Sequence, residues 1–367
     1  MRGKKSRTVS LLWIMGGGLL FVVWMLRSGT HPSPQIIAPL RLASPTTSSP
    51  FSEYGTTIVT CFFDVSKVGQ KTKHPASFYL QTGTAGVLGI KSPMVIFTDS
   101  PNDVAKARKY PELTRIVTVS IKDFQAYQRH FERMQVLFKR DSEGMGNKYS
   151  ALLFTIYHVK PELMNRAAEL DYFHTDKYIY MDVGAIRDWG GIVAADYVDK
   201  RYPAPDREWL IGREDRVQLQ GTATFKSACE ANVRWVEAES PNQVKDVANN
   251  KHPDAILVEP TVVHWWIAGS IFSGNKVALT KYAKAYYVEL QRYLDADYQK
   301  YSLIDQFLMG AMACRYDFVE VVRPPRKCCE ARVNRQWFFL LMFYKNATYP
   351  QTPYSHEEMV ARGMIKA

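Results

Sequence analysis

The sequence has few of the residues that build structural zinc sites. It holds five cysteines in 367 residues, and the adjacent pair Cys328-Cys329 does not have the spacing of a zinc knuckle. The sequence also lacks a G-x-S-x-G motif, an H-E-x-x-H motif, an internal repeat and a long run of Lys and Arg. These absences argue against a serine hydrolase, a zinc protease, a solenoid and a nucleic-acid-binding protein.

Acidic residues are missing from the first fifty positions, which contain six basic residues. The formal charge of +11 therefore falls to 11 − 6 = +5 for residues 51–367, a mild excess that suits an anionic substrate such as a nucleotide. Four of the basic residues precede Leu11–Leu26, which carries no charge, and Arg27 follows it. Extended to residues 9–27, this run predicts a transmembrane signal-anchor. The alternative is a cleaved signal peptide, but the sequence after Arg27 is a poor cleavage site.

The basic cluster before the apolar run predicts a cytosolic tail at residues 1–8. Residues 28–54 are rich in Pro, Ser and Thr and predict a flexible stem, which leaves residues 55–367 as a lumenal domain. Because a short anchor suits a thin bilayer, we expect a single-pass type II protein of the Golgi or endoplasmic reticulum membrane. In that compartment the sequon at Asn346 would be glycosylated.

The five cysteines allow one or two disulfides in an oxidising lumen, with one thiol left over. Cys61 lies in a strand pattern and Cys314 in a helix pattern. We therefore expect both to fill the core rather than to form bridges.

Short apolar runs predict strands at Thr56–Asp64, Pro93–Thr98, Arg115–Ser120 and Lys177–Val183, with a helix from near Asp103. Polar residues stand at the ends of these runs. Alternation of strand and helix indicates an α/β fold with a mixed, mainly parallel sheet flanked by helices.

Helical periodicity is strongest at Val277–Leu294, where Ser273 or Asn275 can cap the start. Residues 185–253 have a weak pattern that does not predict ordered elements. Further helices are predicted at Asp123–Lys139, Tyr149–Asp171 (interrupted at Pro161) and Leu303–Cys314, and further strands at Asp254–Glu259 and Asp317–Val322.

Several motifs resemble the HtrL/YibB-like family over roughly residues 55–320. They are "TTIVTCFFDVSK", "MVIFTD", "YIYMDVGAIRD", "AGSIFSGNKVALTKYAKAYYVEL" and "IDQFLM", in the same order as in the family. The pattern is also similar to the glycosyltransferase A-type (GT-A) fold, which has a Rossmann-like nucleotide half. The resemblance implies a nucleotide-sugar half, a carboxylate at a strand end, and a glycine-containing acceptor loop before a helix.

In enzymes of that fold, a D-x-D motif holds a divalent cation, manganese or magnesium, on the diphosphate of the donor. Asp182 matches the first aspartate, but Gly184 stands in the second position. Asp182 then acts alone through water, or Asp188 completes the metal site, or Arg187 supplies part of the positive charge. The alternative is that Asp182 only caps a turn after its strand.

Asp64 and Asp99 follow the first two strands, and the resemblance implies that they contact the nucleotide near its base or ribose. They could instead bond backbone N–H groups of turns. Lys148 precedes a predicted helix and could meet a phosphate, or lie in solvent.

Acceptor binding is expected at two places. His264 and Trp265 precede Gly274, and aromatic faces stack on sugar rings where glycine lets a substrate approach the backbone. The alternative for this stretch is a core tryptophan pair and a helix-entry turn. Asp305 is a candidate catalytic acid/base or acceptor-orienting carboxylate, with Gln306 beside it to bond a sugar hydroxyl. The alternative is that Asp305 only favours the first turn of its helix.

Taken together, these patterns predict a membrane-anchored glycosyltransferase that moves a sugar from a nucleotide-sugar to a glycan or glycoconjugate acceptor. Two alternatives stay open. One is a sugar-binding or scaffolding protein that kept the fold without catalysis, which Gly184 favours. The other is a different anchored enzyme, such as a hydrolase.

Overall fold

The computed structural model describes residues 51, 53–68, 74–140, 150–186, 194–221, 233–237, 244–245, 267–296, 304–323, 340 and 344–345. The chain divides into residues 1–47 and 48–367, and all of the described residues belong to the second unit. Within these residues no helix has the length and apolar character to cross a membrane. The predicted anchor, residues 9–27, lies outside them.

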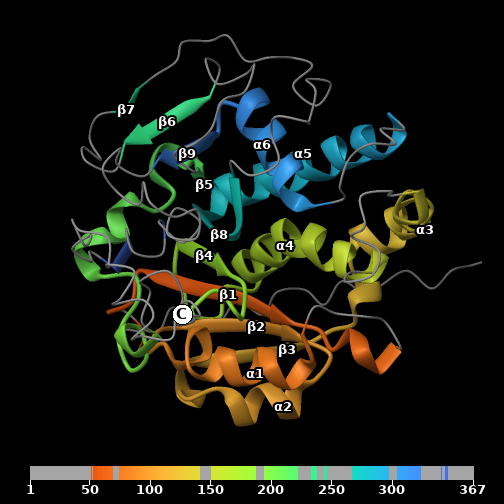
Figure 1. Cartoon of the computed structure of the whole chain (residues 1–367). Helices are drawn as coiled ribbons and strands as arrows, with labels where there is room; N and C mark the ends of the chain where they lie inside the picture. The colour runs from red at the N-terminus through yellow and green to blue at the C-terminus, as the bar shows by residue number, and fades with distance from the viewer. Residues whose placement is uncertain are drawn as a thin grey trace, which may run out of the picture. The chain divides into compact units, whose positions relative to one another are not determined.

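Nine strands and six α-helices make up the described part of the chain (Figure 1). The strands are β1 (Thr56–Phe62), β2 (Met94–Thr98), β3 (Thr114–Thr118), β4 (Lys177–Met181), β5 (Val217–Gly221), β6 (Arg234–Glu237), β7 (Val244–Lys245), β8 (Ile267–Asn275) and β9 (Val319–Arg323). The helices are α1 (Ala76–Thr84), α2 (Pro101–Ala107), α3 (Gln125–Arg140), α4 (Ala151–Leu170), α5 (Lys276–Asp295) and α6 (Asp305–Arg315).

The strands form one sheet in the order β3-β2-β1-β4-β8-β5-β9-β6-β7. Strands β1 to β4 run parallel to one another, β8 is antiparallel to both of its neighbours, and β5, β9 and β6 are again parallel. The prediction of a mixed, mainly parallel sheet is therefore confirmed. Parallel strands bring their carboxyl ends to one edge, which is where ligands bind in open α/β sheets.

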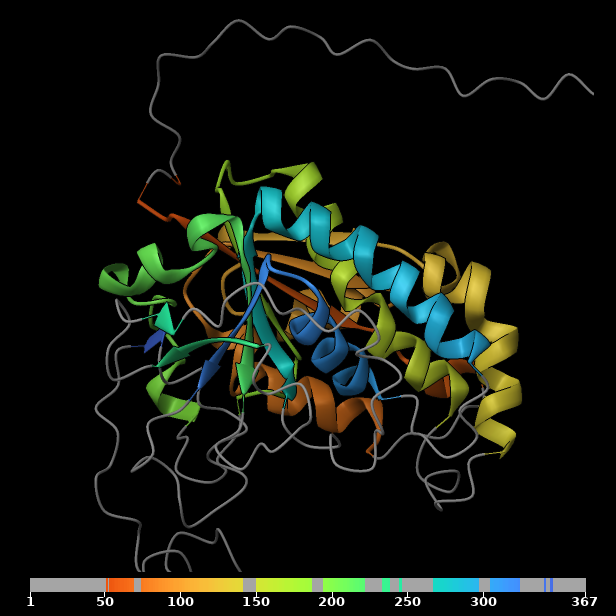
Figure 2. The same ribbon diagram turned by 90° about the horizontal axis from the view of Figure 1, so that it is seen from above.

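Two cores cover the two faces of the sheet because side chains alternate along each strand. One face carries residues such as Val59, Tyr180 and Phe272, and it packs against α3, α4, α5 and α6. The opposite face carries Ile58 and Ile179 and packs against α1 and α2. Figures 1 and 2 show the two helical layers on either side of the strands.

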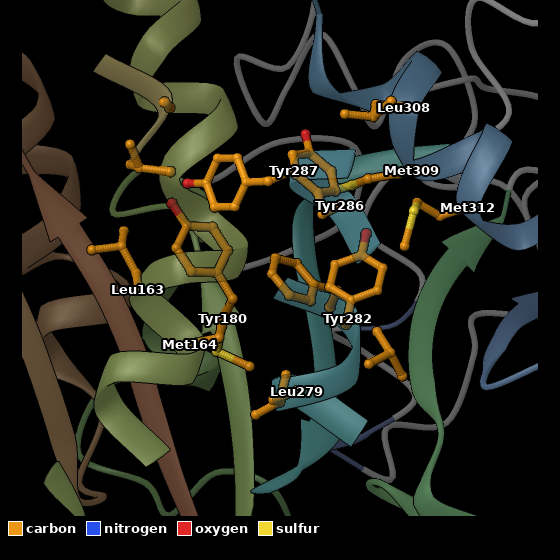
Figure 3. Close-up of a cluster of buried hydrophobic side chains, with 14 of the residues drawn as sticks. Leu163, Met164, Tyr180, Leu279, Tyr282, Tyr286, Tyr287, Leu308, Met309 and Met312 are labelled. Carbon is orange, nitrogen blue, oxygen red and sulfur yellow. The ribbon is translucent and has the colours of Figure 1, made fainter. Parts of the chain in front are cut away.

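Aromatic and sulfur-containing side chains fill the space between β4, α4, α5 and α6. Tyr180 and Phe272 stack with their ring centroids 5.3 Å apart, and Tyr282 lies 5.9 Å from Phe272. Figure 3 shows these tyrosines between Leu163 and Met164 of α4 and the residues of α6. This packing fixes the distance between α4 and α6, the two helices that carry the site below.

Hydrogen bonds fix helix α4 at its first turn and on both sides of residue 160. Ser150 caps its first turn through a bond to the Leu153 amide (3.2 Å). Farther along, His158 Nδ1 lies 2.8 Å from the Tyr286 hydroxyl, and Tyr287 donates to Glu162 at 2.8 Å. These two bonds flank position 160 and tie α4 to α5.

Two sequence expectations need correction. The stretch expected as a loop before the long helix is strand β8, because Ile267–Asn275 pairs with β4 on one side and β5 on the other. Helix α4 continues through Pro161 instead of being interrupted there. Residues 185–253, whose weak pattern left their elements unassigned, contain β5, β6 and β7. The strand expected at Asp254–Glu259 lies outside the described residues.

Candidate functional site

The carboxyl ends of β2, β1 and β4 place three predicted aspartates along the same edge of the sheet. Asp64 and Asp99 are adjacent there, since the Asp64 amide donates to Asp99 Oδ1 at 3.2 Å. Asp64 also accepts from the Ser66 amide, and Asp99 accepts from Ser100 Oγ. The expected position at one edge is confirmed, and in this structure both carboxylates bond turn donors. Their predicted contacts with a nucleotide stay a prediction.

Lys160 lies between Asp182, at this edge of the sheet, and Asp305, at the start of α6. Its ammonium donates to the Gly269 carbonyl at 2.8 Å and lies 2.8 Å from Asp305 Oδ2 and 3.2 Å from Asp182 Oδ1. The lysine side chain is only 3% exposed. We refer to Lys160, Asp182 and Asp305 as the Lys160 centre.

Asp182 is the member of the centre that reaches solvent, with 38% of its side chain exposed. Tyr180, two residues earlier on the same face, donates to Asp182 Oδ1 at 2.9 Å. Burial raises the pKa of Tyr180 well above its usual value, so its hydroxyl stays protonated and can donate. The Asp182 amide donates to the Ser270 carbonyl (2.9 Å), which fixes the backbone. Tyr180 and Lys160 therefore hold the buried side of the Asp182 carboxylate, and its other side is accessible to solvent.

Asp305 begins α6 and is enclosed, with 4% of its side chain exposed. It can lie against β8 because residue 269 is glycine: a Cβ there would come within 2.7 Å of Asp305 Oδ2. Burial raises the pKa of Asp305, and the neighbouring Lys160 ammonium opposes this. For Lys160, burial alone would lower the pKa, but Asp182 and Asp305 together raise it. The lysine is therefore charged at neutral pH.

The centre has an uneven charge. Two carboxylates face one ammonium, so with both acids ionised the group carries one negative charge in excess. Because Asp305 and Lys160 are buried, that excess is presented at Asp182. An arrangement of this kind can accept a proton or a hydrogen bond from a substrate hydroxyl.

Buried polar atoms without a hydrogen-bond partner lie on β8, α5 and α6. Among the described residues, Ser270 Oγ, Gln306 Oε1 and Tyr282 Oη make no hydrogen bond. All three side chains belong to buried residues. Unpaired buried polar atoms are costly, so they call for an explanation such as a missing ligand. Gln306 was predicted to bond a sugar hydroxyl, and its free acceptor is compatible with that role.

The predicted divalent cation does not fit the described part of this site. Tyr180 donates to Asp182 Oδ1 at 2.9 Å, and Lys160 donates to Oδ2 at 3.5 Å with its Nζ also 3.2 Å from Oδ1, so both carboxylate oxygens already face a donor. The described residues contain no group of three or more His, Cys, Asp or Glu side chains that could hold a metal. Asp188, the second predicted ligand, lies outside them. We therefore derive no chemical step through a metal.

Several other predicted residues cannot be placed. Lys148, Arg187, His264, Trp265 and the sequon at Asn346 all lie outside the described residues. Two predicted glycines are described. At Gly184 an added Cβ would meet only Tyr79, at 3.7 Å, so the position has room for a side chain. Gly274 lies inside β8, where a Cβ would come within 3.2 Å of Leu279, which gives it a packing role.

Lys160 and Tyr180 belong to the site but were not predicted from the sequence. Lys160 stands in "IYHVKPELM", a lysine among apolar residues on a helix that packs on two others. A lysine is almost never fully buried without a partner, so this exception was a detectable signal.

The cysteines also differ from expectation. Cys61 is free and buried, as expected. Cys314 is disulfide-bonded, which corrects the prediction that it only fills the core. Cys61 is not its partner, because Cys61 is free.

Comparison with known proteins gives limited information. No family model and no curated protein matches this sequence, and the HtrL/YibB-like resemblance is therefore not supported by a family match. Among solved structures, the apo form of mouse xyloside xylosyltransferase 1 is similar, with a TM-score of 0.36 and 10% identity over 80% of this chain and 94% of that chain. This similarity is too distant to assign an activity.

Proposed function

We propose that this chain is a glycosyltransferase that moves a sugar from a nucleotide-sugar to a hydroxyl of a glycan or glycoconjugate. The observation that carries the proposal is the Lys160 centre, at the carboxyl edge of a mainly parallel sheet. In this centre the Asp182 carboxylate is accessible to solvent, and the buried side chains of Lys160 and Tyr180 bind it from the protein interior. The motif order that resembles GT-A enzymes supports the same interpretation.

In this proposal Asp182 accepts the proton of the acceptor hydroxyl as its oxygen bonds to the anomeric carbon. The bond from that carbon to the diphosphate breaks, and the nucleoside diphosphate leaves with the bonding electrons. Asp305, predicted as the acid/base, lies behind Lys160 and is less exposed than Asp182. Its role here is to position Lys160, and through it Asp182. Gln306 bonds a sugar hydroxyl.

We further propose that the catalytic domain is lumenal, on a type II anchor at residues 9–27 in the Golgi or endoplasmic reticulum. The disulfide at Cys314 supports this, because disulfides persist in oxidising compartments. Protease protection in intact microsomes tests the topology. Digestion of residues beyond 60 from the cytosolic side would contradict it.

The test of activity is a panel of nucleotide-sugars, each assayed for thermal stabilisation of the protein and for release of nucleoside diphosphate. A ligand that binds only the folded state must raise Tm. We expect one donor to raise Tm and to release nucleoside diphosphate in the presence of a suitable acceptor.

A sugar-binding protein without catalysis is the second candidate, and the missing carboxylate at Gly184 favours it. Such a protein would be stabilised by a sugar or nucleotide-sugar without turnover. Stabilisation by no nucleotide-sugar of the panel and by no free sugar would remove both candidates.

A further inference from the structure

The ammonium of Lys160 lies between two carboxylates, one of which is Asp182, the residue at which the resemblance predicted a divalent cation. It donates to the Gly269 carbonyl at 2.8 Å and to Asp182 Oδ2 at 3.5 Å. It also forms ion pairs with Asp305 Oδ2 at 2.8 Å and with Asp182 Oδ1 at 3.2 Å. The cation of this centre is therefore already supplied by the chain.

We propose that Lys160 is a built-in replacement for a divalent metal ion: it holds Asp182 and Asp305 together, and neither carboxylate binds a metal. The proposal deepens the function proposed above and rests on it only where it concerns sugar transfer. It reverses the expectation, drawn from the resemblance, that Asp182 binds manganese or magnesium.

Displacing the ammonium would be costly. Lys160 is buried beside the rings of Tyr157 and Tyr180, whose centroids lie 5.2 Å and 5.4 Å from Nζ. A metal that took its place would leave a charged amine in this enclosed surrounding without a carboxylate, and an unpaired buried charge is strongly destabilising.

The lysine also cannot move away with its helix. The hydrogen bond between His158 and Tyr286 and the one that Tyr287 donates to Glu162 hold α4 on both sides of position 160. On the other side of the centre, the crowding between Gly269 and Asp305 shows that Asp305 lies close against β8. The two carboxylates are therefore held on either side of a fixed ammonium.

The sequence agrees with this assignment at a second position. Gly184 has space for a side chain, yet it provides no second carboxylate next to Asp182. A carboxylate there would add a second protein ligand for a metal, whereas a site that uses Lys160 does not need one.

The experiment compares the full-length parent with Lys160→Met and Lys160→Arg, each with EDTA, with manganese and with magnesium, by thermal unfolding. Methionine keeps the unbranched length and removes the charge, and arginine keeps the charge. The parent and Lys160→Arg should have the same Tm in EDTA and in manganese. Lys160→Met exposes two carboxylates without a counter-ion, so we expect manganese to raise its Tm, on the order of 5 °C at 100 times Kd.

If Lys160→Met does not fold, Asp182→Asn provides a second test of whether a metal binds at Asp182. Stabilisation of the parent by manganese that disappears in Asp182→Asn would overturn the proposal, because the metal would then bind at Asp182. Equal stabilisation of the parent and of Asp182→Asn would place the metal elsewhere and agree with it.

Failure of the proposed function is distinguished by a separate readout. If no nucleotide-sugar binds under any condition, glycosyl transfer is refuted, but the response of Tm to metal still decides whether Lys160 excludes a cation. If a nucleotide-sugar does bind, its affinity for the parent should be the same in EDTA and in manganese. A donor that binds only with manganese, and loses this dependence in Asp182→Asn, would overturn the inference alone.

Discussion

Two buried charge clusters in this molecule differ in their composition and in their access to solvent. The Lys160 centre has two carboxylates around one ammonium, and Asp182 is 38% exposed. The second cluster has one carboxylate, Glu320 of β9, with Arg213 and Arg234 beside it at 3.4 Å and 3.6 Å. Glu320 has no exposed surface, and it also accepts from Gln218 at 2.7 Å. We refer to Glu320, Arg213 and Arg234 as the Glu320 cluster.

The difference lies in where the excess charge is presented. In the Glu320 cluster, the extra positive charge is shared with Glu214, which pairs with Arg234 at 2.8 Å. The cluster links β6, β9 and the segment before β5, and it presents no reactive group. In the Lys160 centre, the excess negative charge reaches solvent through Asp182. Burial of charge alone therefore does not indicate a functional site, whereas an unbalanced charge at a ligand-binding edge does.

The largest effect on stability is expected for Glu320→Gln. The change keeps the shape of the side chain but removes the buried negative charge that faces Arg213 and Arg234, and Arg234 keeps its pair with Glu214. Breaking a buried ion pair costs about 3–5 kcal/mol, so the midpoint of urea unfolding should fall clearly. Ligand affinity of the folded fraction should not change. Normal stability combined with lost ligand binding would reverse the roles of the two clusters.

Asp182→Asn should have the opposite outcome. It removes the charge that is accessible to solvent, and we expect a loss of transition-state stabilisation on the order of 2–4 kcal/mol, seen in kcat/KM for the donor and acceptor that the nucleotide-sugar panel identifies. Unfolding should change little, because this carboxylate is partly hydrated. Asp103→Asn, an exposed position on α2, is the matched control. Parent-like turnover of Asp182→Asn would make Asp182 a turn residue only.

Gln306→Met tests whether the unpaired acceptor beside Asp305 serves a ligand. Replacing an unsatisfied buried group with an apolar side chain of similar shape should leave stability unchanged or raise it by about 1 kcal/mol. Binding of a sugar ligand should weaken at the same time. Gln128→Met, on the exposed face of α3, controls for the substitution itself. A large loss of stability would show that Gln306 is structural.

Much of the fold could be predicted, because hydrophobic periodicity is a local signal. The strands at Thr56, Met94 and Lys177 and the long helix α5 were placed within a few residues. Asn275 indeed caps α5, where it accepts from the Ala278 amide at 2.8 Å. Ser273, the other predicted cap, instead lies within β8.

The errors arise where tertiary contacts decide the structure. Ile267–Asn275 contains four Ser and Gly residues, so it resembles a loop, but pairing on both sides makes it a strand. The Lys160 centre joins α4 and the end of β4 to α6, which is far from both in sequence. Its aspartates could be found from their positions at element ends. Its lysine could be recognised only as a charged residue on an apolar helix. That this lysine pairs with the two aspartates could not be predicted.

The smallest expected effect concerns the rear of the Lys160 centre, where Cys61 Sγ lies 3.5 Å from the Tyr180 hydroxyl. Burial raises the pKa of this thiol to about 12, so only about one molecule in ten thousand carries a thiolate at pH 8. Iodoacetamide should therefore leave Cys61 unmodified in the folded protein and modify it in guanidinium chloride, as measured by mass spectrometry of its peptide. Rapid labelling of native Cys61 would show that the rear of the centre opens. The Lys160 centre would then reach solvent beside Tyr180 as well as at Asp182, so its difference in solvent access from the Glu320 cluster would no longer lie in Asp182 alone.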